Sequence, residues 1–135
     1  MDMEVDEFIK VHKMEQYLYR SMFRTDVPDL LHTIDVYCLP SLWEGLSIAL
    51  LEAMAMKKPI IATPTDGTRE LIQNGKNGIV IPFNNTLALT DAIFTLANSS
   101  EKCKLYGQSA QSLIEKRFNA RRVAEMVSQI YDDCL

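Results

Sequence analysis

Short apolar runs alternate with longer amphipathic stretches along most of this chain. The runs cover residues 36–39, 59–63 and 79–81, and Pro40 and Pro82 end the first and the last of them. Compact apolar runs of this length are typical of strands buried in a parallel sheet. The alternation with helical segments therefore predicts an α/β fold, with a Rossmann-like parallel sheet and flanking helices.

Periodicity and end signals predict the helices. We expect them over residues 4–16, 26–33, 47–56, 68–73, 86–97, 100–117 and 120–134. Asp26 is suited to cap the second helix, and Pro28 is suited to its first turn. Residues 17–23 form a further candidate strand, although polar residues interrupt it.

Composition places the chain among ordinary globular proteins. Its 135 residues, 47% of them apolar and 24% charged, are enough for one domain with a buried core. The formal net charge is −4, and the basic residues are scattered along the chain. Nucleic acid is therefore not expected as a partner, because its binding normally requires a clustered basic face.

The cysteines and the hydropathy of the chain bear on its location. Cys38, Cys103 and Cys134 are far apart and form no CxxC pair, which favours a reducing compartment over a disulfide or zinc framework. The first residues do not resemble a signal peptide, and no apolar run approaches the ~20 residues that a bilayer span needs. We therefore expect a cytoplasmic protein, with any membrane attachment of the full-length protein being peripheral.

The candidate chemistry lies in the loop of residues 40–46, after the first predicted strand. Ligands of open parallel sheets bind outside the carboxyl ends of the strands. Gly45 lets the backbone approach a ligand closely. The amides of Leu46, Ser47 and Ile48 are expected to point toward an anion, as helix N-termini do for phosphate. A simple capping role for Ser47 is equally compatible with this spacing.

Glu52 is the only charged residue in the predicted helix over residues 47–56. A helix that is apolar nearly all round is expected to be buried nearly all round, and a buried carboxylate needs hydrogen-bond partners. Its neighbours four residues away are Ile48 and Met56, so the helix itself supplies no cation. The side chain should lean toward the loop that carries Glu44, where a vicinal diol such as a ribose would bind both oxygens. A salt bridge to a basic residue elsewhere in the fold is the alternative.

These residues resemble a known family. Glu44, seven intervening residues and Glu52 look like the E-x7-E segment of glycosyltransferase family 4, whose members have the GT-B fold and act with retention. Further stretches are similar to the family in the same order: residues 23–31, 58–63, 66–70 and 74–78. The resemblance runs from about Phe23 to the C-terminus.

The resemblance implies an atypical N-terminal segment over residues 1–22 and a donor-binding domain over residues 23–135. A complete GT-B enzyme also has an N-terminal acceptor-binding domain, and its C-terminal domain begins with a strand and loop whose Arg and Lys clamp the diphosphate. Neither is expected here, and Lys10, Lys13 and Arg20 do not sit in the context of that clamp. The chain is therefore expected to be an incomplete C-terminal domain of a GT-B fold.

The resemblance also implies roles for residues of the E-x7-E segment. The position of Glu44 contacts donor-sugar hydroxyls and stabilises charge near the anomeric carbon. The backbone at Gly45, Leu46 and Ser47 lies near the sugar and the diphosphate, and the position of Glu52 holds the ribose.

Three other features of the donor site follow from the resemblance. Gly67 would lie close to the same pocket, Glu70 would support it from the start of the next helix, and Arg24 would line the side of the nucleotide base. No cofactor or metal is implied, because GT-B enzymes generally stabilise the leaving diphosphate with basic residues and helix dipoles.

The implied function is transfer of a sugar from a nucleoside diphosphate sugar to a glycan, lipid or small-molecule acceptor, in polysaccharide or glycoconjugate biosynthesis. The isolated chain is expected to be inactive without the acceptor domain. The alternatives are a non-catalytic nucleotide-sugar-binding or scaffold module that needs a partner domain, and a nucleotide-sugar epimerase with the GT-B fold. Apolar residues of the last helix, Val123, Met126, Val127 and Ile130, are expected to favour self-association if exposed.

Overall fold

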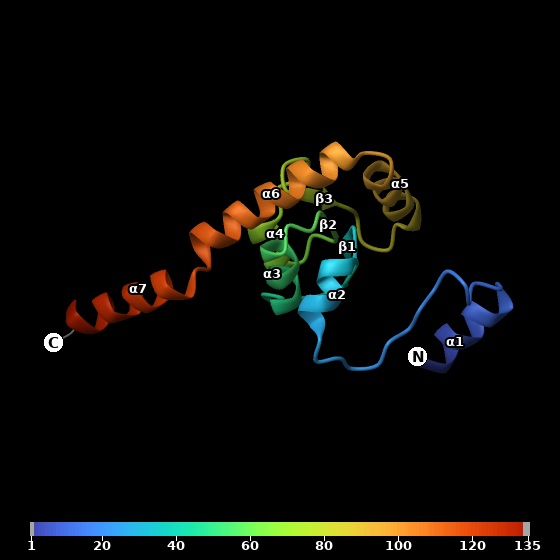
Figure 1. The fold of residues 1–135 in the computed structure, drawn as a ribbon, viewed down its shortest axis with the longest axis horizontal. Coiled ribbons are helices and arrows are strands. Elements are labelled where there is room, and N and C mark those ends of the chain that lie inside the picture. The colour runs from blue at the N-terminus through green and yellow to red at the C-terminus, as the bar shows by residue number, and fades with distance from the viewer. Residues whose placement is uncertain (1, 134–135) are drawn as a thin grey trace.

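Three short parallel strands form the sheet of this protein in a computed structural model, which describes residues 2–133 (Figure 1). The strands are β1 (Tyr37–Leu39), β2 (Ile60–Ala62) and β3 (Gly78–Val80). They are hydrogen-bonded in the order β1-β2-β3, and their register places Cys38, Ile61 and Ile79 side by side. All three apolar runs are confirmed as strands.

Helices occur in every segment for which they were predicted. Their bounds are α1 (Asp2–Val11), α2 (Val27–Thr33), α3 (Ile48–Ala55), α4 (Asp66–Leu71), α5 (Thr86–Ala97), α6 (Ser100–Arg117) and α7 (Ala120–Asp133). The largest differences from expectation are in α1, which ends well before residue 16, and in α4, which begins at Asp66 rather than residue 68. The α/β fold with a parallel sheet and flanking helices is thereby confirmed.

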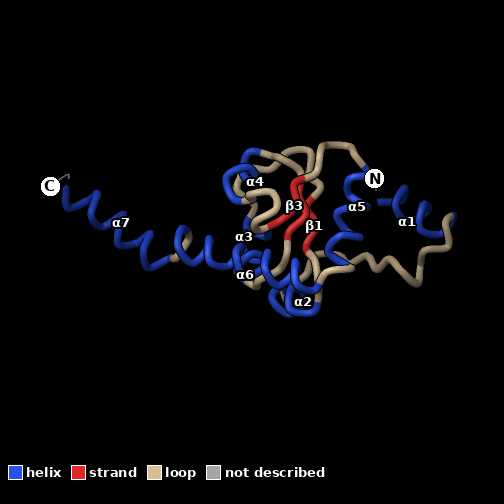
Figure 2. Tube along the Cα trace, turned by 90° about the horizontal axis from the view of Figure 1, so that it is seen from above, coloured by secondary structure: helices blue, strands red, loops and turns tan. Residues whose placement is uncertain are grey.

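Helices cover both faces of the sheet, as Figure 2 shows for α3 and α4 on one side and α5 on the other. Because alternate residues of a strand point to opposite faces, β2 is buried on both sides. Ile60 and Ala62 join the core formed with α2, α3, α4 and α6, whereas Ile61 joins the core formed with α5 and the start of α6. This arrangement leaves the carboxyl ends of the strands, where the loops lie, as the edge that carries the site.

The chain just after α3 contacts two neighbouring helices, α2 and α6. Lys58 Nζ donates hydrogen bonds to the carbonyl oxygens of His32, at 3.2 Å, and Ile34, at 2.9 Å, at the end of α2. Gly107 of α6 lies so close to Lys57 that an added Cβ would stand 2.0 Å from the Lys57 carbonyl oxygen. The positive charge of Lys58 therefore lies at the C-terminal end of α2.

The segment over residues 17–23 is not a strand, contrary to the prediction. Its Arg20 forms an ion pair with Asp6 of α1, with a distance of 2.9 Å from Nη1 to Oδ1. Met22 and Phe23 are exposed and pack on no core. Without a neighbouring strand to complete its backbone hydrogen bonds, the segment follows α1 and leaves the sheet as three strands.

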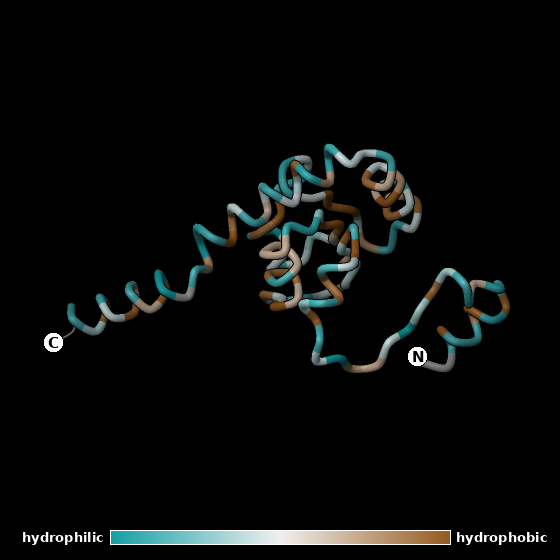
Figure 3. The backbone as a smooth tube through the Cα atoms, viewed as in Figure 1, coloured by the Kyte–Doolittle hydropathy of each residue, from teal (hydrophilic) through white to brown (hydrophobic). Residues whose placement is uncertain are grey.

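The last helix, α7, extends away from the body of the protein, and Figure 3 shows apolar positions recurring along it. Every side chain described from residue 121 to 133 is exposed, while Cys134 lies outside the described residues. The described part of the chain contains no helix with the length and apolar character required to cross a bilayer.

Candidate functional site

The loop between β1 and α3 ends in a capped helix. Ser47 Oγ accepts a hydrogen bond from the amide of Leu50, at 3.4 Å, which confirms Ser47 as the N-cap. The amides of Ile48 and Ala49 have no carbonyl partner within the helix, because the first turn of any helix lacks them. The cap thus leaves two amide donors for an anion at the carboxyl edge of the sheet.

Glu44 is held by its own loop, and the loop is held by β2. The hydroxyl of Ser41 donates a hydrogen bond to Glu44 Oε1 at 3.1 Å. Thr63, directly after β2, donates from its hydroxyl to the carbonyl oxygens of Leu39, at 3.4 Å, and Ser41. The carboxylate of Glu44 is therefore oriented by contacts that reach back to the central strand.

Gly67 and Gly45 bring α4 against this loop. A Cβ added to Gly67 would lie 1.9 Å from the carbonyl oxygen of Gly45 and 3.1 Å from the Cα of Leu46. The first distance is far inside van der Waals contact and its neighbour is backbone, so only glycine fits at position 67 without a shift of the backbone. The structure thus brings together three of the residues predicted for the donor site, Gly45, Leu46 and Gly67.

A small cavity of about 160 Å³ lies between the loop and α4. Its lining residues come from the loop, from the start of α4 and from the segment after β3: Leu42, Trp43, Glu44, Pro64, Thr65, Asp66, Arg69 and Phe83. Asp66, Arg69 and Phe83 were not assigned to the site from the sequence. The signal for the first two was available, since they belong to the stretch over residues 66–70 that carries the family resemblance.

A second cavity of about 300 Å³ lies next to the first, at the carboxyl ends of all three strands. It is lined by residues that follow the strands and by the start of α5: Pro40, Thr63, Ile81, Pro82, Asn84, Asn85, Thr86 and Leu89. Thr63 and Pro82 adjoin Pro64 and Phe83 of the first cavity in the chain. The carboxyl edge therefore carries two adjoining cavities.

Tyr37 of β1 links the two glutamates of the E-x7-E segment. Burial is the main cause that raises the pKa of its hydroxyl, and the negative charges of Glu44 and then Glu52 raise it further. Both carboxylates therefore act on the same phenol. The charges of both predicted ligands thus contribute to the raised pKa of Tyr37.

Glu52 is exposed, contrary to the expectation that its helix is buried nearly all round. Helix α3 buries only the face that carries Leu50, Ala53 and Met54, and it leaves Ile48 71% exposed on the other face. The sheet and α6 cover a single side of the helix, so its apolar composition exceeds what the fold buries. The Glu52 carboxylate thus needs no buried partner and is accessible to a ligand.

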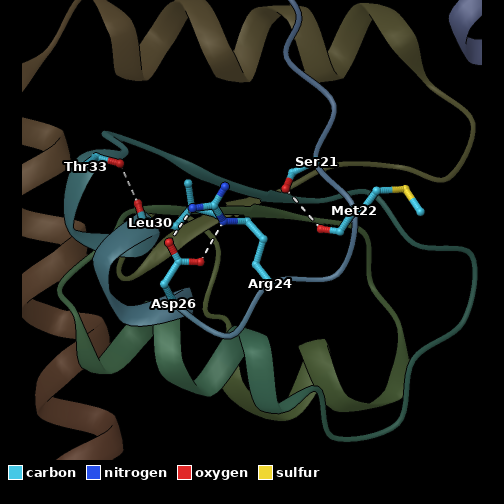
Figure 4. Close-up of polar contacts among 6 residues, drawn as sticks. All are labelled: Ser21, Met22, Arg24, Asp26, Leu30 and Thr33. Carbon is cyan, nitrogen blue, oxygen red and sulfur yellow. Dashed lines mark hydrogen bonds and ion pairs between the residues drawn. The ribbon is translucent and has the colours of Figure 1, made fainter.

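Arg24 is engaged with Asp26, as Figure 4 shows. Its Nε donates to Asp26 Oδ1 at 2.8 Å, and its Nη2 donates to Oδ2. This pairing raises the pKa of Arg24, and the hydrogen bond from Arg24 lowers the pKa of the Asp26 carboxyl. Asp26 stands at the N-cap position of α2 as predicted, but its side chain forms no capping hydrogen bond because the carboxylate pairs with Arg24. Arg24 does not line the cavity beside Glu44.

Glu70 lies near the end of α4 rather than at its start, because the helix begins at Asp66. Its side chain is exposed, and its carbonyl oxygen accepts a hydrogen bond from Arg117 Nη1 at 3.1 Å. The expected position of Glu70 at a helix start is therefore wrong. The early start of α4 brings Asp66 and Arg69 to the cavity instead.

Solved structures with the same fold define the class of this domain. HepE of Anabaena, crystallised in complex with UDP-glucose, superposes with a TM-score of 0.88 at 24% identity, over 96% of this chain and 36% of HepE. The C-terminal domain of a glycosyl transferase group 1 protein, LpcC of Francisella tularensis, superposes with a TM-score of 0.77 at 20% identity, over 88% of this chain and 63% of that domain's chain. The fold is that of a C-terminal domain of GT-B glycosyltransferases.

The chain belongs to the family "Glycosyl transferases group 1", whose model matches residues 9–113. A relative from Escherichia coli, UDP-Gal:alpha-D-GlcNAc-diphosphoundecaprenol alpha-1,3-galactosyltransferase, is 28% identical over 111 residues. The match covers 82% of this chain and 28% of that relative. The chain thus spans less than a third of the length of this relative.

Proposed function

We propose that this chain supplies the donor-binding half-site of a glycosyltransferase that uses a nucleoside diphosphate sugar. The observation that carries the proposal is the contact of Gly67 with Gly45, which joins the Glu44 loop to α4 at the ligand-binding edge of the sheet. The UDP-glucose in the HepE crystal and the UDP-Gal in the name of the Escherichia coli relative support this class of donor.

The residues of the half-site would act on different parts of the donor. Glu44 would bind sugar hydroxyls, and Gly45, Leu46 and Ser47 would lie along the sugar and the diphosphate. The free amides at the start of α3 would face the diphosphate, since helix N-termini favour anions. The exposed carboxylate of Glu52 would accept hydrogen bonds from both ribose hydroxyls.

Residues from the neighbouring elements would complete the half-site. Gly67 would keep α4 against the Glu44 loop, and Glu70 would support α4 from its last turn. Arg24, oriented by Asp26, would line the side of the nucleotide base through its flat guanidinium group. These assignments distribute the donor over the whole carboxyl edge rather than over one cavity.

The proposed reaction breaks the bond between the anomeric carbon and the diphosphate and forms a bond from the same carbon to an acceptor hydroxyl, with retention of configuration. The acceptor would be a glycan, a lipid or a small molecule bound by another domain, on the cytoplasmic side for a membrane lipid. Negative charge develops on the departing diphosphate, and helix amides and basic residues would stabilise it without a metal. The isolated chain would then bind donor without transferring sugar.

Calorimetry with UDP, GDP and ADP sugars tests the proposal through Glu52. Replacement Glu52→Ala removes both hydrogen bonds to the ribose and is expected to weaken donor binding about tenfold or more, since hydrogen bonds to charged groups are worth about 1.5 to 3 kcal/mol. Glu115→Ala, an exposed glutamate on α6, serves as the control and should bind like the parent. Equal binding by Glu52→Ala and the parent would contradict the ribose assignment.

Activity assays separate the proposal from its alternatives. The chain mixed with a nucleotide sugar and a completing acceptor domain should form a glycoside with the anomeric configuration of the donor. Donor binding without any turnover in that mixture would favour a scaffold module, and a donor sugar changed in configuration would favour an epimerase. Transfer by the chain alone would contradict the half-site.

We also propose that the chain self-associates through α7. Its exposed apolar side chains include Val123, Met126, Val127 and Ile130, which are 46%, 58%, 44% and 61% exposed. An apolar stripe of this kind on a projecting helix is typical of an interaction surface.

A further inference from the structure

Arg69 lines the cavity beside Glu44, and its positive charge is not paired with a carboxylate of the described structure. It lies in α4 and lines that cavity together with Asp66 and Glu44. Among the side chains that the structure describes, none forms a hydrogen bond or an ion pair with its guanidinium group. An arginine beside two carboxylates that pairs with neither has its donors available for a ligand.

The two walls of the cavity are held at a set distance from each other. Gly67 touches the backbone of Gly45, so α4 cannot approach the Glu44 loop more closely. Thr65 Oγ1 donates a hydrogen bond to Thr68 Oγ1 at 2.9 Å, and both residues are buried at the start of α4. The carboxylate of Glu44 is oriented by Ser41. The backbone segments that carry Arg69 and Glu44 are therefore held against each other by contacts within the protein itself.

The lining of the cavity matches the chemistry of a sugar ring. Sugar hydroxyls are both donors and acceptors, and the cavity offers carboxylate acceptors on Glu44 and Asp66 with guanidinium donors on Arg69. Its rim carries Trp43, 82% exposed, and Phe83, 39% exposed, whose rings present apolar faces. Small-molecule sites typically combine aromatic walls with a few convergent polar groups in this way.

We propose that Arg69 contacts the transferred sugar from the wall opposite Glu44 and is a specificity-determining residue for the donor. This inference rests on the proposed function, because it takes the cavity as the sugar side of the donor site. The nucleoside diphosphate would bind elsewhere along the carboxyl edge, at α3 and Glu52. Arg69 should therefore act on nucleotide sugars and not on the nucleoside diphosphates themselves.

Paired titrations of the full chain test this separation. UDP with UDP-glucose, GDP with GDP-mannose, and ADP with ADP-glucose are titrated by ligand-observed NMR, and the pair that binds the parent is used. Arg69→Gln is expected to weaken binding of the nucleotide sugar about tenfold, the worth of a hydrogen bond to a charged group. Binding of the matching nucleoside diphosphate should stay unchanged, and Arg69→Lys should recover part of the loss.

Arg121→Gln is the matched control, since Arg121 is 89% exposed on α7 and should leave both affinities as they are in the parent. The urea midpoint of Arg69→Gln should equal that of the parent, which separates a contact with the ligand from a structural role. Equal losses for nucleotide sugar and nucleoside diphosphate, or no loss for either, would overturn the assignment of Arg69 while leaving the donor site in place. A parent chain that binds none of the six ligands would overturn the proposed function, and the role of Arg69 with it.

Discussion

Gly45 and Gly67 meet through their backbones, although 21 residues separate them in the chain. The contact is asymmetric, because a Cβ on Gly67 would collide with the Gly45 carbonyl, whereas a Cβ on Gly45 would meet nothing within 4 Å. The two glycines therefore have different reasons to lack a side chain. Gly67 permits the packing of α4, and in the proposed donor site Gly45 would leave space on the side of the ligand.

Gly67→Ala is expected to destabilise the protein by about 1 to 3 kcal/mol, the usual penalty for overpacking a close contact. Urea unfolding followed by circular dichroism measures the change. Gly45→Ala is the control from the other side of the same contact, and its stability should lie within about 0.5 kcal/mol of the parent. Equal stability of the two variants would show that the contact between Gly67 and Gly45 is not rigid.

Glu52 lies in a different environment from the one that its sequence context predicts. The sequence identified it as the one carboxylate on an apolar helix, and buried partners were the expected consequence. The structure exposes it instead. Its proposed role as a ribose ligand now depends on access from solvent.

At the scale of elements, α3 is held between the sheet and α6. Leu50, Ala53 and Met54 fill the core beneath it, and Gly107 lets α6 cross directly over the carbonyl of Lys57. The C-terminal end of α3 is thus closely packed, whereas its N-terminal end is open. One helix therefore contributes both to the core and to the proposed donor site.

Gly107→Ala distinguishes steric packing from helix propensity by the sign of its effect. Alanine is favoured over glycine by about 0.5 to 1 kcal/mol in a helix interior, so a spacious site would stabilise the protein. With a Cβ 2.0 Å from the Lys57 carbonyl oxygen, we expect a net loss in the free energy of unfolding of about 1 to 3 kcal/mol instead. Gln108→Ala, at the exposed neighbouring position, should stay within about 0.5 kcal/mol of the parent in the same urea titration. A stabilised Gly107→Ala would refute the close contact.

At the scale of the whole molecule, a body of sheet and helices carries two projecting ends. Figure 1 shows α1 and α7 extending away from the body. A helix of 14 residues whose described side chains from residue 121 are all exposed gains little stability from burial, so α7 would gain most from a partner surface. The body, by contrast, owes its stability to the two cores on the sheet.

Removal of residues 120–135 should leave the free energy of unfolding of the body within about 0.5 kcal/mol of the parent, because the side chains described on α7 from residue 121 are exposed. Sedimentation velocity should show that the parent self-associates and that the truncated chain does not. Val127→Asp, on the apolar stripe, should also abolish association, whereas its neighbour Ser128→Asp should not. A monomeric parent at all concentrations would contradict the proposed self-association.

Local patterns determined much of this fold. Apolar runs located the three strands, and helical periodicity located the helices, because both depend on which side chains an element must bury. Ser47 as the N-cap of α3 was also predictable, since a cap depends on residues within one turn. The same segment supplied the family resemblance that the family model confirms.

Only the tertiary structure decided which faces are covered and which distant residues meet. It left Glu52 and the outer face of α3 exposed, and it kept residues 17–23 out of the sheet. Arg69 lines the same cavity as Glu44 because α4 begins at Asp66 and packs through Gly67 on Gly45. Periodicity in the sequence shows how apolar each face of a helix is. Whether that face is covered, and where a cavity forms, depends on the elements that pack against it. Those contacts join segments far apart in the chain.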